Sequence, residues 1–319
     1  MANVLFISPD FFNYYQNISN ELNKLGYEVT WYNDRPSNSF ISKAIIRMNK
    51  KMLKKKIDKY LDNILKENKD KDFAYVLFIF GQSFEKRHVK KIREAYPNAK
   101  FIYYAWDSIG AFPFIKELYT EFDVAYSFDD VDCEKYGFKF LPLFYSNQKI
   151  ECETKYDCCA IQTIKVGKLE NYEKIKSILP ENLKMFSYLY LQSKLVYLYY
   201  RLKYKIFKKY KINDFKYETL TREATNKISN ESKVIIDCQM RNQIGLTIRT
   251  FEALHLKKKL ITSNKNIMKY EFYTPNNIYI INDENKEKIP NEFFEKEFDD
   301  SFELSNNYSL ENFVKQLLD

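Results

Sequence analysis

The sequence alternates short, continuous apolar runs with amphipathic stretches, and this alternation is the feature that most constrains its fold. Val4–Ser8 is an uninterrupted apolar run, which is typical of a strand buried on both faces of a parallel sheet. Residues 13–25 place apolar side chains at intervals of three and four, so they are predicted to form an amphipathic helix. Gly26 follows where a helix end favours a left-handed residue, and residues 27–32 alternate as a second strand. This segment therefore predicts a βαβ unit with a right-handed crossover.

The same pattern continues to residue 141 and starts again near residue 157. In the first half, further strands are predicted at residues 73–80, 100–106, 124–127 and 138–141. In the second half, strands are predicted at residues 157–164, 183–191, 234–238, 259–262 and 277–281. Because strands alternate with helices, we predict an α/β fold of two doubly wound, Rossmann-like domains facing a cleft.

A polar, irregular segment at residues 145–155 separates the two halves of the pattern. We therefore expect one domain over residues 1–148 and a second over residues 149–319. The closing helix, predicted at residues 310–318, is expected to pack back on the first domain.

The composition excludes several kinds of site. The 319 residues contain six glycines and two histidines, which argues against a glycine-rich phosphate loop, a histidine-rich metal site and most Ser-His-Asp schemes. The five cysteines are odd in number and lack C-x-x-C spacing, which favours a reduced cytoplasm over a disulfide framework. No apolar run approaches the length of a membrane-spanning helix, and the N-terminus lacks the basic start of a signal peptide. We expect a cytoplasmic protein.

Two clusters are expected to be structural. Asp129, Asp130 and Asp132 stand at a predicted helix start, where capping and interaction with the helix dipole are favoured over a cation site. Cys158 and Cys159 fall in a predicted strand and are expected to be buried, inert thiols.

The segment at residues 234–262 carries the most specific chemical pattern. A buried strand runs into a polar turn that contains Gly245, and a helix begins directly after it. A helix N-terminus offers unpaired N–H groups and a positive dipole to a phosphate, and Gly245 allows close backbone approach. Thr247 adds a hydroxyl, Arg249 is able to hold a phosphate by two hydrogen bonds, and Glu252 is able to accept hydrogen bonds from ribose hydroxyls. The alternative is an ordinary strand–turn–helix whose Arg249 and Glu252 form a surface ion pair.

The run GLTIRTFEALHLKKKLITSNK in this segment resembles the donor-site segment of bacterial GT-B glycosyltransferases found in capsule and lipopolysaccharide clusters. The N-terminal half is similar to that group in VLFISPD, YYAWDSIGAFP and SFDDVDCEKYGFKFLPLFY. The resemblance implies a C-terminal donor domain like those of families 1 and 4 and an N-terminal acceptor domain. It implies transfer of a sugar from a nucleotide-sugar, with UDP-sugar as the first expectation, to a cell-surface glycan or lipid-linked acceptor. We expect that neither a cofactor nor a metal ion is required. Gly245 and Leu246 are then expected to contact the donor.

The match to the acidic pair of that group is partial. In retaining GT-B families a Glu-x7-Glu pair closes on the donor sugar and ribose, and Glu252 matches the second acid. The first falls at Ile244, so Gln243 is the nearest polar candidate to replace it. This departure keeps open the alternative that the protein is an inactive GT-B-like partner subunit.

A second departure lies at the end of the strand predicted over residues 157–164. The group has a glycine in that turn beside the donor diphosphate, whereas this chain has Gln162. Lys165 and Lys168 follow and could supply charge for the phosphates. The alternative is that they are two solvated lysines in a loop.

Candidate catalytic residues follow the strands of the first domain. Asp10, Gln82 and Asp107 come after the first, third and fourth strands, so a parallel sheet brings them to one edge. An inverting glycosyl transfer needs a base to deprotonate the acceptor hydroxyl. We expect Asp107 first and Asp10 second in that role, against the alternative that Asp107 only caps a turn or helix.

Two stretches are strongly basic in a chain of net charge +8. Lys43–Lys59 holds seven Lys and one Arg, and residues 182–213 hold eight Lys and Arg, nine aromatics and no acid. The stripe of Leu195, Leu198, Leu202 and Ile206 is expected to dock into the core, with its neighbouring lysines in solvent. The alternative is contact of these basic helices with the inner face of the cytoplasmic membrane. A basic nucleic-acid-binding module is a less favoured function, and no nucleic-acid partner is expected.

Overall fold

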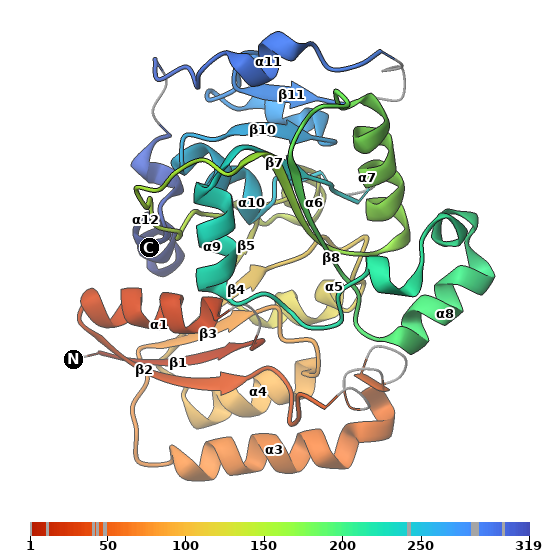
Figure 1. The fold of residues 1–319 in the computed structure, drawn as a ribbon. Helices are drawn as coiled ribbons and strands as arrows, with labels where there is room; N and C mark the ends of the chain where they lie inside the picture. Colours follow the sequence, from red (N-terminus) through yellow and green to blue (C-terminus); the bar gives the residue numbers. More distant parts are fainter. Residues whose placement is uncertain are drawn as a thin grey trace. The chain divides into compact units, whose positions relative to one another are not determined.

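The computed structural model describes residues 2–10, 13–39, 42, 45–46, 50–240, 244–281, 287–301 and 304–319. The chain divides into two compact units (Figure 1). Unit 1 comprises Met1–Pro142 with Ser309–Asp319, and unit 2 comprises Leu143–Tyr308. Residues 143–148, which the sequence placed in the first domain, therefore belong to unit 2.

Unit 1 is built on one sheet in which every neighbouring pair of strands is parallel. The strand order is β2-β1-β3-β4-β5-β6. The strands are β1 (Ala2–Ser8), β2 (Tyr27–Asn33), β3 (Tyr75–Ile79), β4 (Lys100–Ala105), β5 (Val124–Ser127) and β6 (Lys139–Phe140). The helices are α1 (Tyr14–Lys24), α3 (Lys54–Glu67), α4 (Lys86–Ala95), α5 (Ile115–Leu118), α6 (Asp130–Tyr136) and α12 (Leu310–Leu318).

Helices cover both faces of this sheet, so its central strands are buried on both sides. Figure 1 shows α1 on one face and α3 and α4 on the other. The C-terminal helix α12 packs beside α1, and its Phe313 ring meets Tyr104 of β4 at 4.9 Å. Because both faces are covered, β1 and β4 read as continuous apolar runs.

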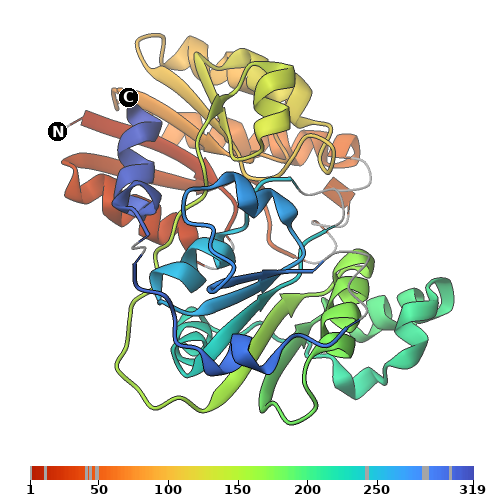
Figure 2. The same cartoon turned by 90° about the horizontal axis from the view of Figure 1, so that it is seen from above.

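Unit 2 repeats this plan with the strand order β11-β10-β9-β7-β8, again all parallel. The strands are β7 (Tyr156–Thr163), β8 (Met185–Tyr190), β9 (Ser232–Asp237), β10 (Lys259–Thr262) and β11 (Ile278–Ile280). The helices are α7 (Val166–Ile178), α8 (Lys194–Lys203), α9 (Arg222–Asn230), α10 (Ile248–His255) and α11 (Asn291–Glu295). Figure 2 shows these helices around the sheet.

The two sheets share one topology. In each, the first strand lies between the second and the third, so the direction of winding reverses beside it. This reversal lies between β1 and β3 in unit 1 and between β7 and β9 in unit 2. Doubly wound sheets bind ligands outside the carboxyl ends of the strands at such a switch point. The topology therefore indicates one candidate crevice in each unit.

The structure confirms that Asp129 caps a helix and that Cys158 and Cys159 are buried. The Asp129 carboxylate caps α6 by accepting from the Val131 and Asp132 amides at 3.1 and 3.2 Å. Cys158 and Cys159 are fully buried in β7.

The expected burial of the stripe at residues 195–206 is wrong for its three leucines, whereas Ile206 packs against the core of unit 2 as expected. Leu195, Leu198 and Leu202 are 73%, 50% and 85% exposed. Helix α8 instead turns the opposite face, which carries Tyr197 and Tyr200, towards the core of unit 2. Rings bury more area than leucines, and their hydroxyls find hydrogen-bond partners there. Helix α8 ends at Lys203, before a short 3-10 turn at Lys205–Lys209.

Of the other basic stretch, residues 43, 44 and 47–49 lie outside the described residues. Its later part forms a 3-10 turn at Lys50–Leu53 and the start of α3. No helix in the described ranges is long and apolar enough to cross a membrane.

Candidate functional site

The candidate site of unit 2 lies where β7 and β9 stop pairing. Their ladder ends at Cys159 opposite Ile235, although both strands continue beyond it. The buried Gln162 side chain spans the gap, and its Nε2 donates to the Ile236 carbonyl at 2.8 Å. Gln162, which stands where the resembling group has glycine, therefore joins the two strands at the switch point.

A buried carboxylate closes the end of β9. The Asp237 side chain accepts at Oδ2 from the Thr247 hydroxyl at 2.5 Å, Gln239 Nε2 at 3.1 Å and the Thr250 hydroxyl at 3.3 Å. These hydrogen bonds attach the first turn of α10 to the strand that precedes it. Sequence reasoning missed Asp237, although its place at a strand end was a usable signal. The Thr247 hydroxyl, expected to meet the donor, is engaged with this carboxylate.

The turn before α10 is held from the neighbouring strand. Asn264 follows β10, and its Nδ2 donates to Gln239 Oε1 at 2.7 Å and to the Ile244 carbonyl at 2.9 Å. Gly245 and Leu246 are buried beside it. Gln243, the expected substitute for the missing acid, lies outside the described residues.

Two helix N-termini follow the strands that flank the switch point, because α7 follows β7 and α10 follows β9. Lys165 precedes α7 and Thr247 precedes α10, and neither residue makes a side-chain capping hydrogen bond within the described chain. The first amides of a helix have no partners inside the helix and carry its positive dipole. Within the described chain, the switch point of unit 2 therefore has two helix N-termini whose N-cap side chains do not cap them, an arrangement that suits an anion such as a diphosphate.

Lys168 and Arg249 add positive charge to these two helices. Both are half-buried, and no carboxylate of the described residues lies within 4.0 Å of either side chain. Burial raises the pKa of the Cys238 thiol, and the positive charge of Lys168 partly offsets this rise. Lys168 therefore lies near Cys238, which directly follows β9. The alternative ion pair between Arg249 and Glu252 is therefore not formed.

Glu252 lies one turn into α10 and is half-buried. Its backbone carbonyl accepts a hydrogen bond from Asn147 Nδ2 at 3.1 Å. At the end of α10, the rings of Tyr145 and His255 are stacked, with centroids 3.9 Å apart and nearly parallel planes. The C-terminal part of α10 is thus held by the segment that precedes β7.

Unit 1 has its own buried carboxylate at the carboxyl edge. Asp34 follows β2 and is fully buried, accepting from Arg35 Nε at 2.7 Å and from the Gln82 amide at 3.0 Å. The hydrogen bond from the Gln82 backbone amide attaches Asp34 to the turn after β3. This turn contains two consecutive left-handed residues, Phe80 (φ 71°) and Gly81 (φ 68°). Sequence reasoning used strand ends to select Asp10 and Asp107 but overlooked Asp34.

The two predicted bases occupy different places along this edge. Asp10 follows β1 at the switch point, is exposed, and accepts from Asn38 Nδ2 at 3.2 Å. Asp107 follows β4, which β3 separates from β1, and is half-buried. Burial raises the pKa of the Tyr103 hydroxyl, and the negative charges of Asp34 and Asp107 raise it further.

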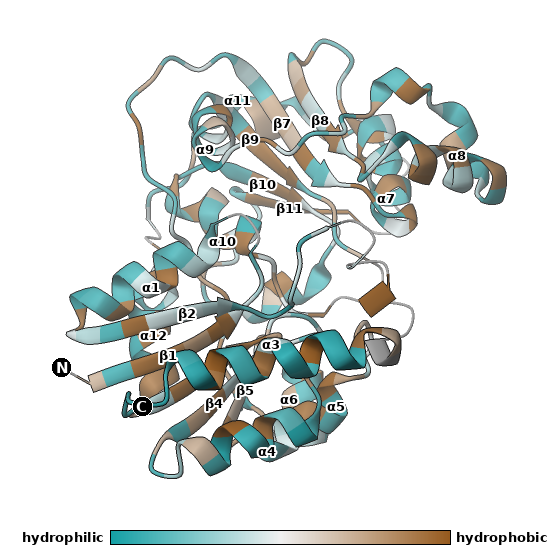
Figure 3. Cartoon of the chain, turned by 90° about the horizontal axis from the view of Figure 1, so that it is seen from below, coloured by the Kyte–Doolittle hydropathy of each residue, from teal (hydrophilic) through white to brown (hydrophobic). Residues whose placement is uncertain are grey.

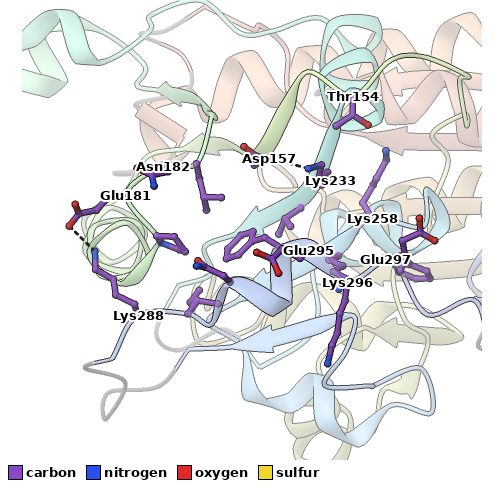
Figure 4. A pocket seen from close by; sticks show the side chains of 18 of the residues that line it. Thr154, Asp157, Glu181, Asn182, Lys233, Lys258, Lys288, Glu295, Lys296 and Glu297 are labelled. Carbon is purple, nitrogen blue, oxygen red and sulfur yellow. Dashed lines mark hydrogen bonds and ion pairs between the residues drawn. The ribbon is translucent and has the colours of Figure 1, made fainter.

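A cavity of about 950 Å³ lies at the opposite edge of the sheet in unit 2. Asp157, Lys233 and Lys259 line it from the amino ends of β7, β9 and β10. Figure 4 shows Lys233 paired with Asp157, and Lys288 paired with Glu181. None of the described residues predicted to bind the donor lines this cavity.

No known family model matches the sequence, and no curated protein matches it. Similar folds occur among solved structures. Sucrose-phosphate synthase from Thermosynechococcus elongatus is 9% identical with a TM-score of 0.62, over 100% of this chain and 90% of that one. A glycosyltransferase from Rickettsia africae is 12% identical with a TM-score of 0.59, over 99% of this chain and 97% of that one. HepE of Anabaena, in complex with UDP-glucose, is 7% identical with a TM-score of 0.58, over 100% of this chain and 98% of that one. The chain has the GT-B fold of two α/β domains.

Proposed function

We propose that this protein is a glycosyltransferase that moves a sugar from a nucleotide-sugar donor to a cell-surface glycan or lipid-linked acceptor. The observation that carries the proposal is the pair of helix N-termini at the switch point of unit 2, which Lys165 and Thr247 do not cap with their side chains, with Lys168 and Arg249 on the same helices. The Anabaena protein of similar fold binds UDP-glucose, which supports a UDP-sugar as the first donor to test. The sequence resemblance supports capsule or lipopolysaccharide synthesis in the cytoplasm.

In this proposal the donor diphosphate lies against the amides that begin α7 and α10. Lys165, Lys168 and Arg249 neutralise its charge, and the backbone of Gly245 and Leu246 lies alongside. Hydrogen bonds and cations that are in place before reaction stabilise the charge that develops on the leaving diphosphate. Glu252 accepts hydrogen bonds from the ribose. The Thr247 hydroxyl positions the first turn of α10 through Asp237.

The acceptor hydroxyl loses its proton to a carboxylate of unit 1. Asp10 and Asp107 are the candidates, and the topology favours Asp10 because it follows β1 at the switch point. Its carboxylate is exposed, so an acceptor is able to reach it. A general base contributes about a hundredfold to ten-thousandfold to such a step.

Thermal unfolding with UDP, GDP, CMP and their sugars tests the donor site. A ligand that binds only the folded protein adds about 2.7 kcal/mol of stability at a hundredfold excess over its Kd. We expect one nucleotide class to raise the midpoint, and Lys168→Gln and Arg249→Gln to reduce that shift. Lys227→Gln is the matched control, because Lys227 is an exposed lysine on α9 of the same unit. Absence of a shift with every nucleotide would contradict the proposal.

Turnover of the donor identified in this way tests the catalytic residues. Asp10→Asn should lower kcat by about a hundredfold or more while the nucleotide shift stays unchanged. A larger loss in Asp107→Asn than in Asp10→Asn would assign the base to Asp107. Nucleotide binding without turnover on any acceptor would instead favour the inactive partner subunit.

A further inference from the structure

Helix α8 presents an apolar face to solvent. Leu195, Leu198 and Leu202 are at least half exposed, as is Tyr199 at 54%. Figure 3 shows the hydrophobic positions along this helix. Leucines so exposed, at intervals of three and four, form one continuous stripe along a helix. We call these four residues the outer face of α8.

The orientation of α8 is fixed by its opposite side. Tyr197 is buried, and its hydroxyl donates to the Tyr210 carbonyl at 2.8 Å. The Tyr200 ring meets Phe207 at 4.9 Å, and the Ser193 hydroxyl caps the helix by accepting from the Val196 amide at 3.2 Å. Because these contacts anchor the inner side, the outer face is a stable feature of the folded unit.

Cations border the outer face on both sides. At about 100° per residue, Lys194 and Arg201 fall along one edge of the leucine stripe and Lys203 along the other. All three are exposed. Residues 182–213 contain no acid. Within the described chain, the only carboxylate within 4.0 Å of a cation in this segment is Glu173, which lies 3.9 Å from Lys209.

We propose that the outer face of α8 docks on the surface of an anionic lipid bilayer. The leucines would enter the boundary between headgroups and acyl chains, to a depth of about 5–10 Å. Lys194 and Lys203 would meet lipid phosphates, with their aliphatic stems along the apolar surface. The Arg201 guanidinium donates to the Tyr197 hydroxyl at 3.0 Å and adds its charge at the edge of the outer face. Tyr199 has the ring and hydroxyl that suit the interface.

Charge favours a bilayer over the other partners that an apolar face could take. A second copy of the chain would bring two acid-free, basic segments together, which like-charge repulsion opposes. A nucleic acid would use stacked rings, and only one of the four residues on the outer face is aromatic. An anionic bilayer satisfies the leucines and the cations at once.

The docking surface begins at the same edge of the sheet as the candidate donor site. Helix α8 follows β8, and α7 follows the neighbouring parallel strand β7. A bilayer on α8 would therefore lie beside the carboxyl edge of unit 2. The proposal itself rests on α8 and not on glycosyl transfer, and its test needs no donor or acceptor.

Co-sedimentation of the full chain with lipid vesicles tests the proposal. We expect binding to vesicles of equal parts phosphatidylcholine and phosphatidylglycerol, and weak binding to phosphatidylcholine alone. The triple variant Leu195→Asn, Leu198→Asn and Leu202→Asn should lower the partition coefficient by about tenfold or more, because its leucines no longer gain by burial. Met268→Asn is the matched control, since Met268 is 55% exposed elsewhere in unit 2. The thermal midpoint of the triple variant should stay unchanged.

A second variant separates the contribution of charge. Lys194→Gln with Lys203→Gln should weaken binding to the anionic vesicles and leave the weak binding to neutral vesicles unchanged. Failure of the wild-type chain to bind anionic vesicles would overturn the proposal, as would equal binding by the triple variant. A dimer or an oligonucleotide complex that depends on the same leucines would reassign the outer face to that partner.

Discussion

The Thr247 hydroxyl donates a 2.5 Å hydrogen bond to the Asp237 carboxylate, which joins the end of β9 to the residue that precedes α10. A threonine at this position commonly accepts a hydrogen bond from the helix that it begins. Here it donates to the strand instead, and no side-chain cap from Thr247 covers the first amides of α10. Thr247 and Asp237 therefore hold the start of α10 against the end of β9.

Thr247→Val should destabilise the protein by about 1–2 kcal/mol, because the buried Asp237 carboxylate loses one of its donors. The change should appear as a lower denaturant midpoint with an unchanged slope. Thr219→Val is the control, since Thr219 is exposed in the same unit. Equal effects of the two substitutions would show that the hydrogen bond contributes nothing to stability.

Gly81→Ala should destabilise the protein by more than about 1 kcal/mol. Gly81 has φ +68°, and an added Cβ would lie 2.9 Å from Phe78 Cδ1. Gly110→Ala is the matched control, because Gly110 has open space around it and no positive φ. Unfolding in denaturant compares the two variants, and a Gly81→Ala protein as stable as the control would show that the turn relaxes freely.

Protonation of His88 should cost stability below neutral pH. His88 Nδ1 accepts from the Glu85 amide at 2.9 Å, and Nε2 lies 2.8 Å from Asp58 Oδ1. Burial lowers the pKa of His88 from its usual 6.5, so the unfolded chain takes up the proton first. The stability that neutral His88 contributes to the folded state is fully present above pH 6.5. It is lost as the pH falls towards the lower pKa that His88 has in the folded protein.

His88→Gln isolates this effect from the titration of carboxylates. The free energy of unfolding should fall less in the variant than in the wild type between about pH 8 and about pH 5. Parallel curves for the two proteins would mean that the His88 pKa is the same in the folded and unfolded states.

Cys152 should be the thiol that reacts first with a soluble disulfide reagent under native conditions. Cys152 is exposed, whereas Cys158, Cys159 and Cys238 are buried. Burial raises the pKa of the Cys158 thiol to about 12 and also raises that of Cys159. The thiolate is the reactive form, so the buried groups should react only on unfolding. Cys152→Ser should remove the fast phase, and a fast phase that persists would place the reactive thiol elsewhere.

Local sequence signals predicted much of the fold because they act over a few residues. The apolar run at Val4–Ser8 became β1, and the buried strand expected at residues 157–164 became β7. Asp129 caps α6 as its position at a helix start predicted. Lys165 and Gly245, which follow predicted strands, come after β7 and β9, the two strands that flank the switch point of unit 2.

Long-range pairing could not be predicted in this way. The order of the strands brings the Gln162 side chain to the carbonyl of Ile236, and Asp34 to the amide of Gln82. Partners 74 and 48 residues apart in sequence leave no local pattern. The absence of an ion pair between Arg249 and Glu252, despite their favourable spacing, is likewise a property of the folded unit.

Helix α8 shows most clearly which features the sequence determined and which the tertiary structure determined. Its sequence by itself specified a basic helix with apolar residues on both sides, and periodicity could not tell which side would be buried. Only the tertiary structure decided this, because Phe207 and Phe215 provide a surface on which Tyr197 and Tyr200 pack. The aromatic side gains more from burial and satisfies its hydroxyl there. The leucines of the outer face are consequently left exposed.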